Sequence, residues 1–325
     1  MNIGLFDSGL GGLIITRACI AAMPEYNYVY MGDTLHVPYG ARSAAAVYEF
    51  TRACVDALFR KHDCAIVLIA CNTASIAALR RLQREYLPQN FPDRRILGVV
   101  IPTAESAAES GARRIGLLAT DATARSSVYP TEIKKLIPDA EIFPVAAPLL
   151  VPLIENDGDK FAAPVIVEYL SKFSPALAAG PQSASATQRD AGAGPKGTGE
   201  NSKPSPGAQN SATDPSAREG LGIDTLILGC THFPHYKNEI AKMMPGVKIL
   251  SQDEIIPEKL RDYLNRHPEI NTKLLPPRGE SSRRNGVATD GGGQNNFFVT
   301  DISESYLTQA ARLFGNEIKI EKTNV

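Results

Sequence analysis

Short apolar runs alternate along the chain with stretches in which apolar residues recur at helical spacing. Strands are expected at 2–6, 27–31, 64–70, 95–100, 114–120, 141–146, 224–229, 247–251, 297–300 and 317–322. Helices are expected at 13–23, from Ser43 onward, at 71–86, at about 255–266 and at about 303–314. Strands and helices that alternate in this way are typical of parallel α/β architecture. The pattern therefore predicts an α/β protein whose mostly parallel sheets are flanked by helices.

Two stretches interrupt this pattern. Residues 175–219 are rich in Ala, Gly, Pro and Ser and contain few large apolar side chains, and residues 276–295 are similar but shorter. Such segments bury too little apolar surface to offset the entropy lost on ordering. We expect both to be insertions outside the working fold, the first of them disordered.

Chain length and charge narrow the class of protein. With 325 residues the chain exceeds the usual size of a single core, so two domains are expected. Its 34 Lys and Arg are balanced by 35 Asp and Glu, which disfavours nucleic acid as a partner. No apolar run approaches the roughly 20 residues of a membrane span, so a membrane location is not expected.

The cysteines and the first residues suggest the compartment. The start of the chain lacks the basic and apolar regions of a secretory signal. Five cysteines without an export signal indicate reduced thiols rather than a disulfide scaffold. We therefore expect a cytoplasmic protein.

Two of these cysteines stand in matching contexts. The segments IACNT (69–73) and LGCTH (228–232) each place a cysteine at the carboxyl end of an apolar strand and before an expected helix. Ligands of open α/β sheets bind at that end, and a helix N-terminus favours an anion. A thiol there can be drawn toward a lower pKa, which makes a usable thiolate. Cys19, Cys54 and Cys64 lack this context and are expected to be ordinary buried residues.

Two thiols at one pocket suit the inversion of a stereocentre. One group removes a proton from one face of a carbon while the other delivers a proton to the opposite face, and the roles exchange for the other enantiomer. This chemistry needs neither a metal nor an organic cofactor, and we expect none.

Six motifs then carry a resemblance that covers nearly the whole chain outside the two insertions. They are DSGLGG (7–12), GDTLHVPYG (32–40), ACNTAS (70–75), LATDATARSSVY (118–129), VPLIE (151–155) and LGCTHFP (228–234). Their order and spacing resemble those of the glutamate racemase family, which belongs to the cofactor-independent aspartate/glutamate racemase superfamily. The cysteine pair, with DSG and PYG, favours that family over its relatives.

The resemblance implies roles for individual residues. Cys71 and Cys230 would be the bases for opposite enantiomers, with Asp7 beside the first thiol and Glu155 and His232 near the second. The residues that would bind substrate are Asp7, Ser8, Tyr39, Gly40, Asn72, Thr73, Thr123, Thr231 and His232, with Thr120 a weaker candidate.

It also implies an organisation and a role in the cell. One lobe, residues 1–98 and 252–325, would carry Cys71; the other, residues 99–251, would carry Cys230, and the site would lie in the cleft between two pseudo-symmetric lobes. The partner would be the small molecule glutamate, and the D-glutamate produced would supply peptidoglycan synthesis. The oligomeric state stays open, with a homodimer among the alternatives.

Other functions remain. An aspartate or hydantoin racemase of the same superfamily would use the same two thiols, and a two-lobed amino-acid binding protein would not use them. A thiol redox or metal protein is disfavoured, because the chain has no CxxC and no ligand partner at zinc spacing near Cys71 or His232.

Overall fold

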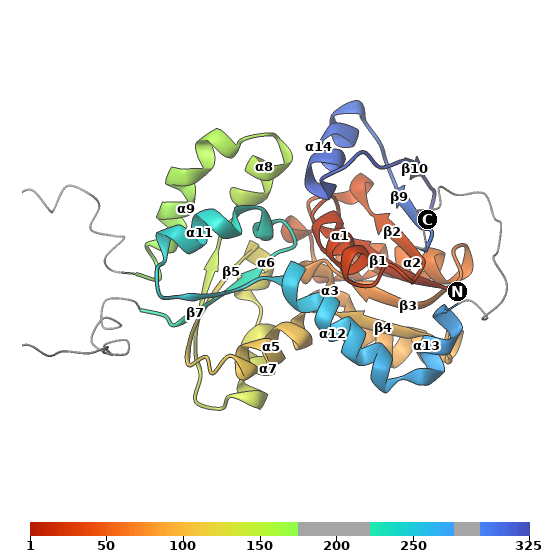
Figure 1. The fold of residues 1–325 in the computed structure, drawn as a ribbon, viewed down its shortest axis with the longest axis horizontal. Coiled ribbons are helices and arrows are strands. Elements are labelled where there is room, and N and C mark those ends of the chain that lie inside the picture. The colour runs from red at the N-terminus through yellow and green to blue at the C-terminus, as the bar shows by residue number, and fades with distance from the viewer. Residues whose placement is uncertain (175–221, 276–292) are drawn as a thin grey trace, which may run out of the picture.

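The computed structural model describes residues 1–174, 222–275 and 293–325 (Figure 1). The expected insertion at 175–219 lies outside these residues, as does most of the one at 276–295. The end of the second expected insertion was placed too far along the chain. The backbone N–H of Gly293 donates to the carbonyl of Pro24, and strand β9 begins at Asn295.

Two parallel sheets organise the described residues. The first has the order β10–β9–β2–β1–β3–β4, and its strands are β1 (Asn2–Asp7), β2 (Tyr28–Gly32), β3 (Cys64–Ile69), β4 (Arg95–Gly98), β9 (Asn295–Val299) and β10 (Ile320–Lys322). The second has the order β6–β5–β7–β8, and its strands are β5 (Arg114–Ala119), β6 (Glu141–Ala146), β7 (Thr225–Gly229) and β8 (Lys248–Leu250). The predicted α/β class with parallel sheets is confirmed.

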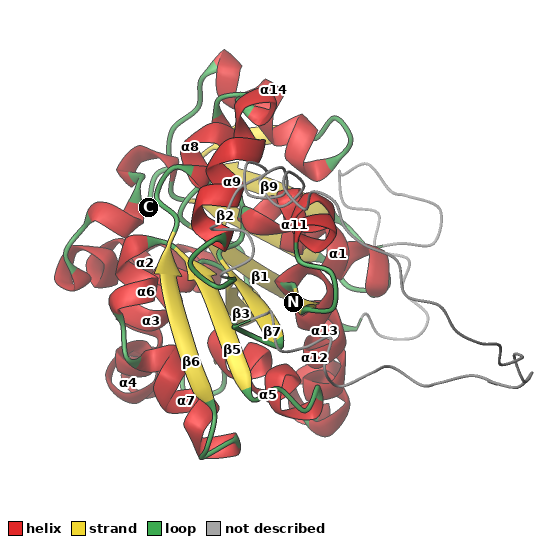
Figure 2. Ribbon diagram, turned by 90° about the vertical axis from the view of Figure 1, so that its left-hand side faces the viewer, coloured by secondary structure: helices red, strands yellow, loops and turns green. Residues whose placement is uncertain are grey.

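Helices flank both sheets, as Figure 2 shows. Their bounds are α1 (Gly12–Ala22), α2 (Ala44–Arg60), α3 (Asn72–Arg81), α4 (Leu87–Asn90), α5 (Val100–Glu109), α6 (Asp121–Arg125), α7 (Val128–Leu136), α8 (Leu150–Glu155), α9 (Ala162–Leu170), α11 (Lys237–Met243), α12 (Gln252–Arg266), α13 (Pro268–Leu274) and α14 (Glu304–Phe314). None of these helices is long and apolar enough to cross a membrane.

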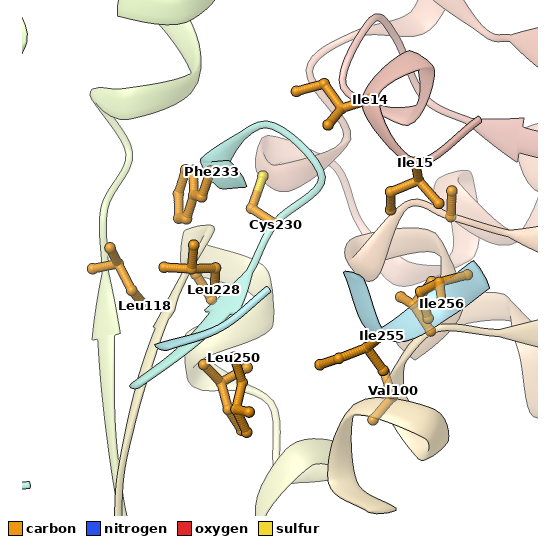
Figure 3. Packing of buried hydrophobic residues seen from close by; sticks show 14 of the residues in the cluster. Ile14, Ile15, Val100, Leu118, Leu228, Cys230, Phe233, Leu250, Ile255 and Ile256 are labelled. Carbon is orange, nitrogen blue, oxygen red and sulfur yellow. The ribbon is translucent and has the colours of Figure 1, made fainter. Parts of the chain in front are cut away.

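Side chains of the central strands alternate between two clusters of buried residues. Ile3 and Leu5 of β1 belong to the cluster on the side of α1 and α12, and Phe6 belongs to the cluster under α2 and α3. This alternation is the period of a strand with both faces covered. The first cluster continues into the second sheet, where Figure 3 shows Leu228 near Cys230. The carboxyl end of β7 is therefore continuous with the core of the molecule.

Two expected boundaries were wrong, each for a local reason. The strand expected at 95–100 ends at Gly98, because Val100 already belongs to α5 and is buried with residues three, four and seven positions later. The helix expected at 71–86 is a regular α-helix only as far as Arg81. A π-helical turn, Leu82–Tyr86, then connects it to α4. Pro88 has no N–H to donate to the preceding turn, which favours this widening.

Candidate active site

Strand order places Asp7, Ser8 and Cys71 at one edge of the first sheet. Strand β1 lies between β2 and β3, and the helices that follow β1 and β3 cover opposite faces of the sheet. Such a reversal opens a crevice at the carboxyl ends of the two strands, where ligands of α/β proteins bind. Asp7 ends β1, and Cys71 follows β3 by two residues.

The second sheet repeats this arrangement around Cys230. Strand β5 lies between β6 and β7, and Ala119 at its end is paired with Gly229 at the end of β7. Thr120 and Cys230 come directly after these two residues. Each sheet thus presents one candidate cysteine at the crevice predicted by its own topology.

Cys71 caps helix α3 and touches the loop after β1. Its Sγ accepts a hydrogen bond from the backbone N–H of Ala74 at 3.4 Å and lies 3.5 Å from the Ser8 hydroxyl oxygen. The residue is only 6% exposed. Burial and the charge of Asp7 raise the pKa of the Cys71 thiol to about 12. The expectation that the helix terminus lowers this pKa was wrong, because the hydrogen bond from Ala74 does not offset desolvation.

Cys230 lies beside an imidazole that is paired with a carboxylate. The Sγ of Cys230 is 3.8 Å from Nδ1 of His232, and Nε2 of the same ring is 2.9 Å from Oε1 of Glu155. Burial lowers the pKa of His232, but the contacts with Cys230 and Glu155 raise it, and the net result lies well above its usual value. A protonated ring can donate to both partners. A 3₁₀ turn, Phe233–Tyr236, follows instead of the expected regular helix, and the seven-residue α11 comes only after it.

Asp7 is fully buried beneath this site. Its Oδ1 accepts a hydrogen bond from the backbone N–H of Gly9 at 2.9 Å, and Oδ2 has no hydrogen-bond partner among the described residues. Burial raises the pKa of Asp7, and the charge of His232 opposes this rise. The aspartate therefore adds an oxygen without a hydrogen-bond partner among the described residues close to both halves of the site.

A Gly-rich loop after β1 borders Cys71 and the two residues that follow Cys230. Ser8 contacts Cys71, and the backbone of Gly11 packs so closely against the other half that a Cβ there would lie 2.4 Å from both Nδ1 of His232 and Oγ1 of Thr231. The hydroxyl of Tyr30 on β2 donates a hydrogen bond to the carbonyl of Gly9 and so fixes the loop. The neighbourhoods of the two thiols are thus joined through one short loop, and the charge of Cys230 contributes to the raised pKa of Cys71.

The tight packing at Gly11 gives a direct prediction. A Gly11→Ala substitution should displace His232 and lower kcat in a racemisation assay by about 10-fold or more, since small misplacements of a reacting group can cost about 100-fold. Gly9→Ala is the matched control, because its Cβ would meet its nearest neighbours at 3.3 and 3.5 Å. Equal rates for the two variants would contradict this account of Gly11.

Several hydroxyl groups line the remaining side of the site. Oγ1 of Thr73 lies 3.1 Å from Oγ1 of Thr120, which in turn donates to Oγ1 of Thr123 at 3.1 Å. A Cβ on Gly40 would lie 3.4 Å from Cβ of Thr120, so the residue borders the same chain of hydroxyls. Thr120, the weaker candidate from sequence, is the member that links the two sheets here.

Two predicted substrate-binding side chains are already engaged. The hydroxyl of Tyr39 donates to Oδ2 of Asp33 at 2.6 Å and is buried. The amide of Asn72 exchanges hydrogen bonds with Gln252 and accepts one from Tyr129. Both side chains are thus bonded within the protein, and their part in holding substrate stays a prediction.

The structure also adds a residue that the sequence did not suggest. The hydroxyl of Tyr306 on α14 is buried and has no hydrogen-bond partner among the described residues. Burial, followed by the charges of Asp7 and Glu155, raises its pKa well above the usual value. Nothing in the local sequence marks this tyrosine, because α14 reaches the site from the far end of the chain.

No group of three His, Cys, Asp or Glu side chains that could hold a metal ion occurs within residues 1–174, 222–275 and 293–325. The polar side chains around the two cysteines comprise hydroxyls, one imidazole and two carboxylates, and they hydrogen-bond mainly to one another.

Comparison with known proteins decides the family. The family model described as Asp/Glu/Hydantoin racemase matches residues 13–172. A glutamate racemase of Sulfurihydrogenibium sp. (strain YO3AOP1) is 32% identical over 325 residues, which span 99% of this chain and 96% of the relative. The chain belongs to the glutamate racemase family.

Further glutamate racemases agree in sequence and in fold. One from Paracoccus denitrificans (strain Pd 1222) is 32% identical over 307 residues, 89% of this chain and 96% of its own. The crystal structure of a glutamate racemase isoform from Bacillus anthracis has a TM-score of 0.71 at 25% identity, covering 100% of this chain and 97% of that one. The family resemblance inferred from six motifs is confirmed, and with it the assignment to the isomerases.

Proposed function

We propose that the protein interconverts L- and D-glutamate by proton transfer between the α-carbon and two cysteines. The observation that carries this proposal is that Cys71 and Cys230 follow strands of two separate sheets, while one loop contacts Cys71 through Ser8 and packs through Gly11 against the two residues that follow Cys230. The curated relatives most similar to the chain are glutamate racemases, which supports glutamate as the substrate.

One direction of turnover would use Cys71 as the acid and Cys230 as the base. Cys71 carries a pKa raised to about 12 and therefore a proton. The imidazolium of His232 can donate Nδ1–H to a thiolate at Cys230. The thiolate takes the α-proton, the C–H electron pair stays on the α-carbon, and the Cys71 thiol gives its proton to the opposite face. These steps leave a thiol at Cys230 and a thiolate at Cys71, and the opposite enantiomer starts from that state and runs the same steps in reverse.

Neutral donors would hold the carboxylates of the substrate. The first backbone N–H groups of α3 have no acceptor within the helix, and they point toward the end where Cys71 lies. The hydroxyls of Ser8, Thr73 and Thr120 lie around the same end. The unpaired oxygen of Asp7 would accept from the substrate ammonium group. Neutral donors directed at a carboxylate stabilise the charge that develops when the α-carbon loses its proton.

The division into lobes at residues 98/99 and 251/252 forms part of the proposal. The cysteines are only 6% and 5% exposed, so a substrate reaches them when the two sheets move apart and is enclosed when they close. Enclosure excludes water and strengthens the hydrogen bonds of the site. We also assign the product D-glutamate to peptidoglycan precursor synthesis in the cytoplasm, which rests on the family alone.

Solvent deuterium exchange tests the function. The purified protein, incubated with L-glutamate or L-aspartate in deuterated water, should abolish the optical rotation of glutamate and place deuterium at its α-carbon. Aspartate should turn over at least about 10-fold more slowly. Faster turnover of aspartate would assign an aspartate racemase, and binding of glutamate without exchange would indicate a binding protein.

A further inference from the structure

A network of hydrogen-bonded polar side chains lies behind Cys71. Its members are Asn72, Thr103, Tyr129 and Gln252, each at most 2% exposed. Nδ2 of Asn72 donates to Oε1 of Gln252 at 2.8 Å, and Nε2 of Gln252 donates back to Oδ1 of Asn72 at 3.0 Å. The Tyr129 hydroxyl donates to the same Oδ1 at 2.7 Å. We call these four residues the interlobe network.

The network fixes the residue that directly follows Cys71. Asn72 is the first residue of α3, and both polar atoms of its side chain are bonded. A buried amide whose oxygen and nitrogen are both bonded resists rotation, because rotation would break these hydrogen bonds. The peptide between Cys71 and Asn72 is therefore held from behind by side chains on other helices.

Tyr129 comes from the part of the chain that carries Cys230, and Gln252 stands at the boundary where the chain returns to the part that carries Cys71. Tyr129 lies on α7, which follows β5, and Gln252 begins α12 directly after β8. In Figure 1, α12 extends from the second sheet toward the helices of the first. Burial raises the pKa of Tyr129, and the charge of Cys230 adds to this rise, so the hydroxyl stays protonated and lies near the second thiol. The network thus joins the surroundings of both cysteines.

We infer that Tyr129 and Gln252 are positioning residues that set the place of Cys71 relative to Cys230 through the side chain of Asn72. This inference rests on the proposed racemase function. A rate that depends on two bases on opposite faces of one carbon requires their separation to be fixed, and errors of about 1 Å in such geometry cost about 100-fold.

The test compares variants that remove hydrogen bonds of the interlobe network with a variant that removes a buried tyrosine hydroxyl outside it. Tyr129→Phe removes the hydrogen bond that the hydroxyl donates to Asn72 and the one that it accepts from Gln252. Gln252→Met, at similar volume, removes both hydrogen bonds to Asn72 and those to Thr103 and Tyr129. Tyr28→Phe is the matched control for Tyr129→Phe, because the Tyr28 hydroxyl is also buried and donates to the carbonyls of Cys19 and Met23 on α1 and its cap. The two tyrosine variants should lower the unfolding temperature by comparable amounts, and Gln252→Met should lower it further.

Only the network variants should alter the chemical step. Tyr129→Phe and Gln252→Met should each lower kcat by about 10- to 100-fold while KM changes less than about 3-fold, and the α-deuterium isotope effect on kcat should be at least as large as in the wild type. The double variant should lose little more than the worse single variant, because both changes break one network. Tyr28→Phe should keep the wild-type kcat.

Three results would overturn the inference. The first is a kcat for Tyr129→Phe equal to that of Tyr28→Phe, the second a rise in KM with kcat unchanged, and the third full additivity in the double variant. Failure of the wild-type protein to racemise glutamate would instead overturn the proposed function, so the two failures are distinguishable.

Discussion

The Cys71→Ala and Cys230→Ala variants are each expected to lose racemisation of glutamate by about 10⁴-fold. General acid–base catalysis contributes about 10² to 10⁴ per group, and each thiol is needed in both directions, once as a base and once as an acid. The measurement is the change of optical rotation from either enantiomer, with the unfolding temperature recorded for each variant. Cys19→Ala is the control, since Cys19 is buried in α1 away from the site.

A substrate with a halogen on the β-carbon separates the two thiols. Elimination needs only one base: the α-proton goes to a thiolate, the C–H electron pair forms the new double bond, and halide leaves with the carbon–halogen pair. Each single variant should therefore still eliminate from one enantiomer, and the two variants should prefer opposite enantiomers. Full racemisation by either variant, or the same preference in both, would refute the two-base assignment.

Much of the fold follows from local sequence because the central strands are apolar on both faces. The run at 64–70 has no periodicity that a surface helix would require, and it forms β3, which lies between β1 and β4 in the first sheet. Val99 and Val100 extend a similar run, yet they turn into α5, because an apolar pair fits a strand end and a buried helix start equally well. Boundaries of this kind depend on packing that the sequence does not display.

The sequence predicts those site residues that directly follow a strand. It does not predict side chains that come together from distant parts of the chain. Cys71 and Cys230 are marked by the polar residues that follow them. Gln252 is 180 positions from Asn72, and Tyr129 is 57 positions from it, yet the three form one network. Tyr129 even lies within a recognised motif, but no local pattern indicates that its hydroxyl binds Asn72 rather than a substrate.

Replacing His232 by Asn is expected to lower kcat/KM by about 100-fold for both enantiomers. The imidazole contacts Cys230 at 3.8 Å and Glu155 at 2.9 Å, and Asn cannot supply a cation to the thiolate. The factor must be equal in both directions, because the enantiomers have equal free energies in water. Progress curves from pure L- and D-glutamate measure both values.

The pH dependence of kcat/KM separates this role from simple packing. The pKa of His232 lies well above its usual value, so the imidazolium persists above neutral pH, and activity should fall as pH rises through that raised value. Glu155→Gln keeps an acceptor for Nε2 but removes the negative charge that raises the pKa of His232. Its alkaline limb should therefore move to lower pH, while the maximal rate stays within about 10-fold of the wild type.

In His232→Asn the alkaline limb that belongs to the imidazolium should be absent, and a fall should remain only where the α-ammonium group of the free substrate loses its proton. The thiol of Cys71 does not produce a limb in this range, because burial and Asp7 raise its pKa to about 12. The measurement is kcat/KM from pH 5.5 to 10 for the wild type and both variants. An unchanged alkaline limb in His232→Asn would show that another group controls it, and His232 would then act only by filling space beside Cys230.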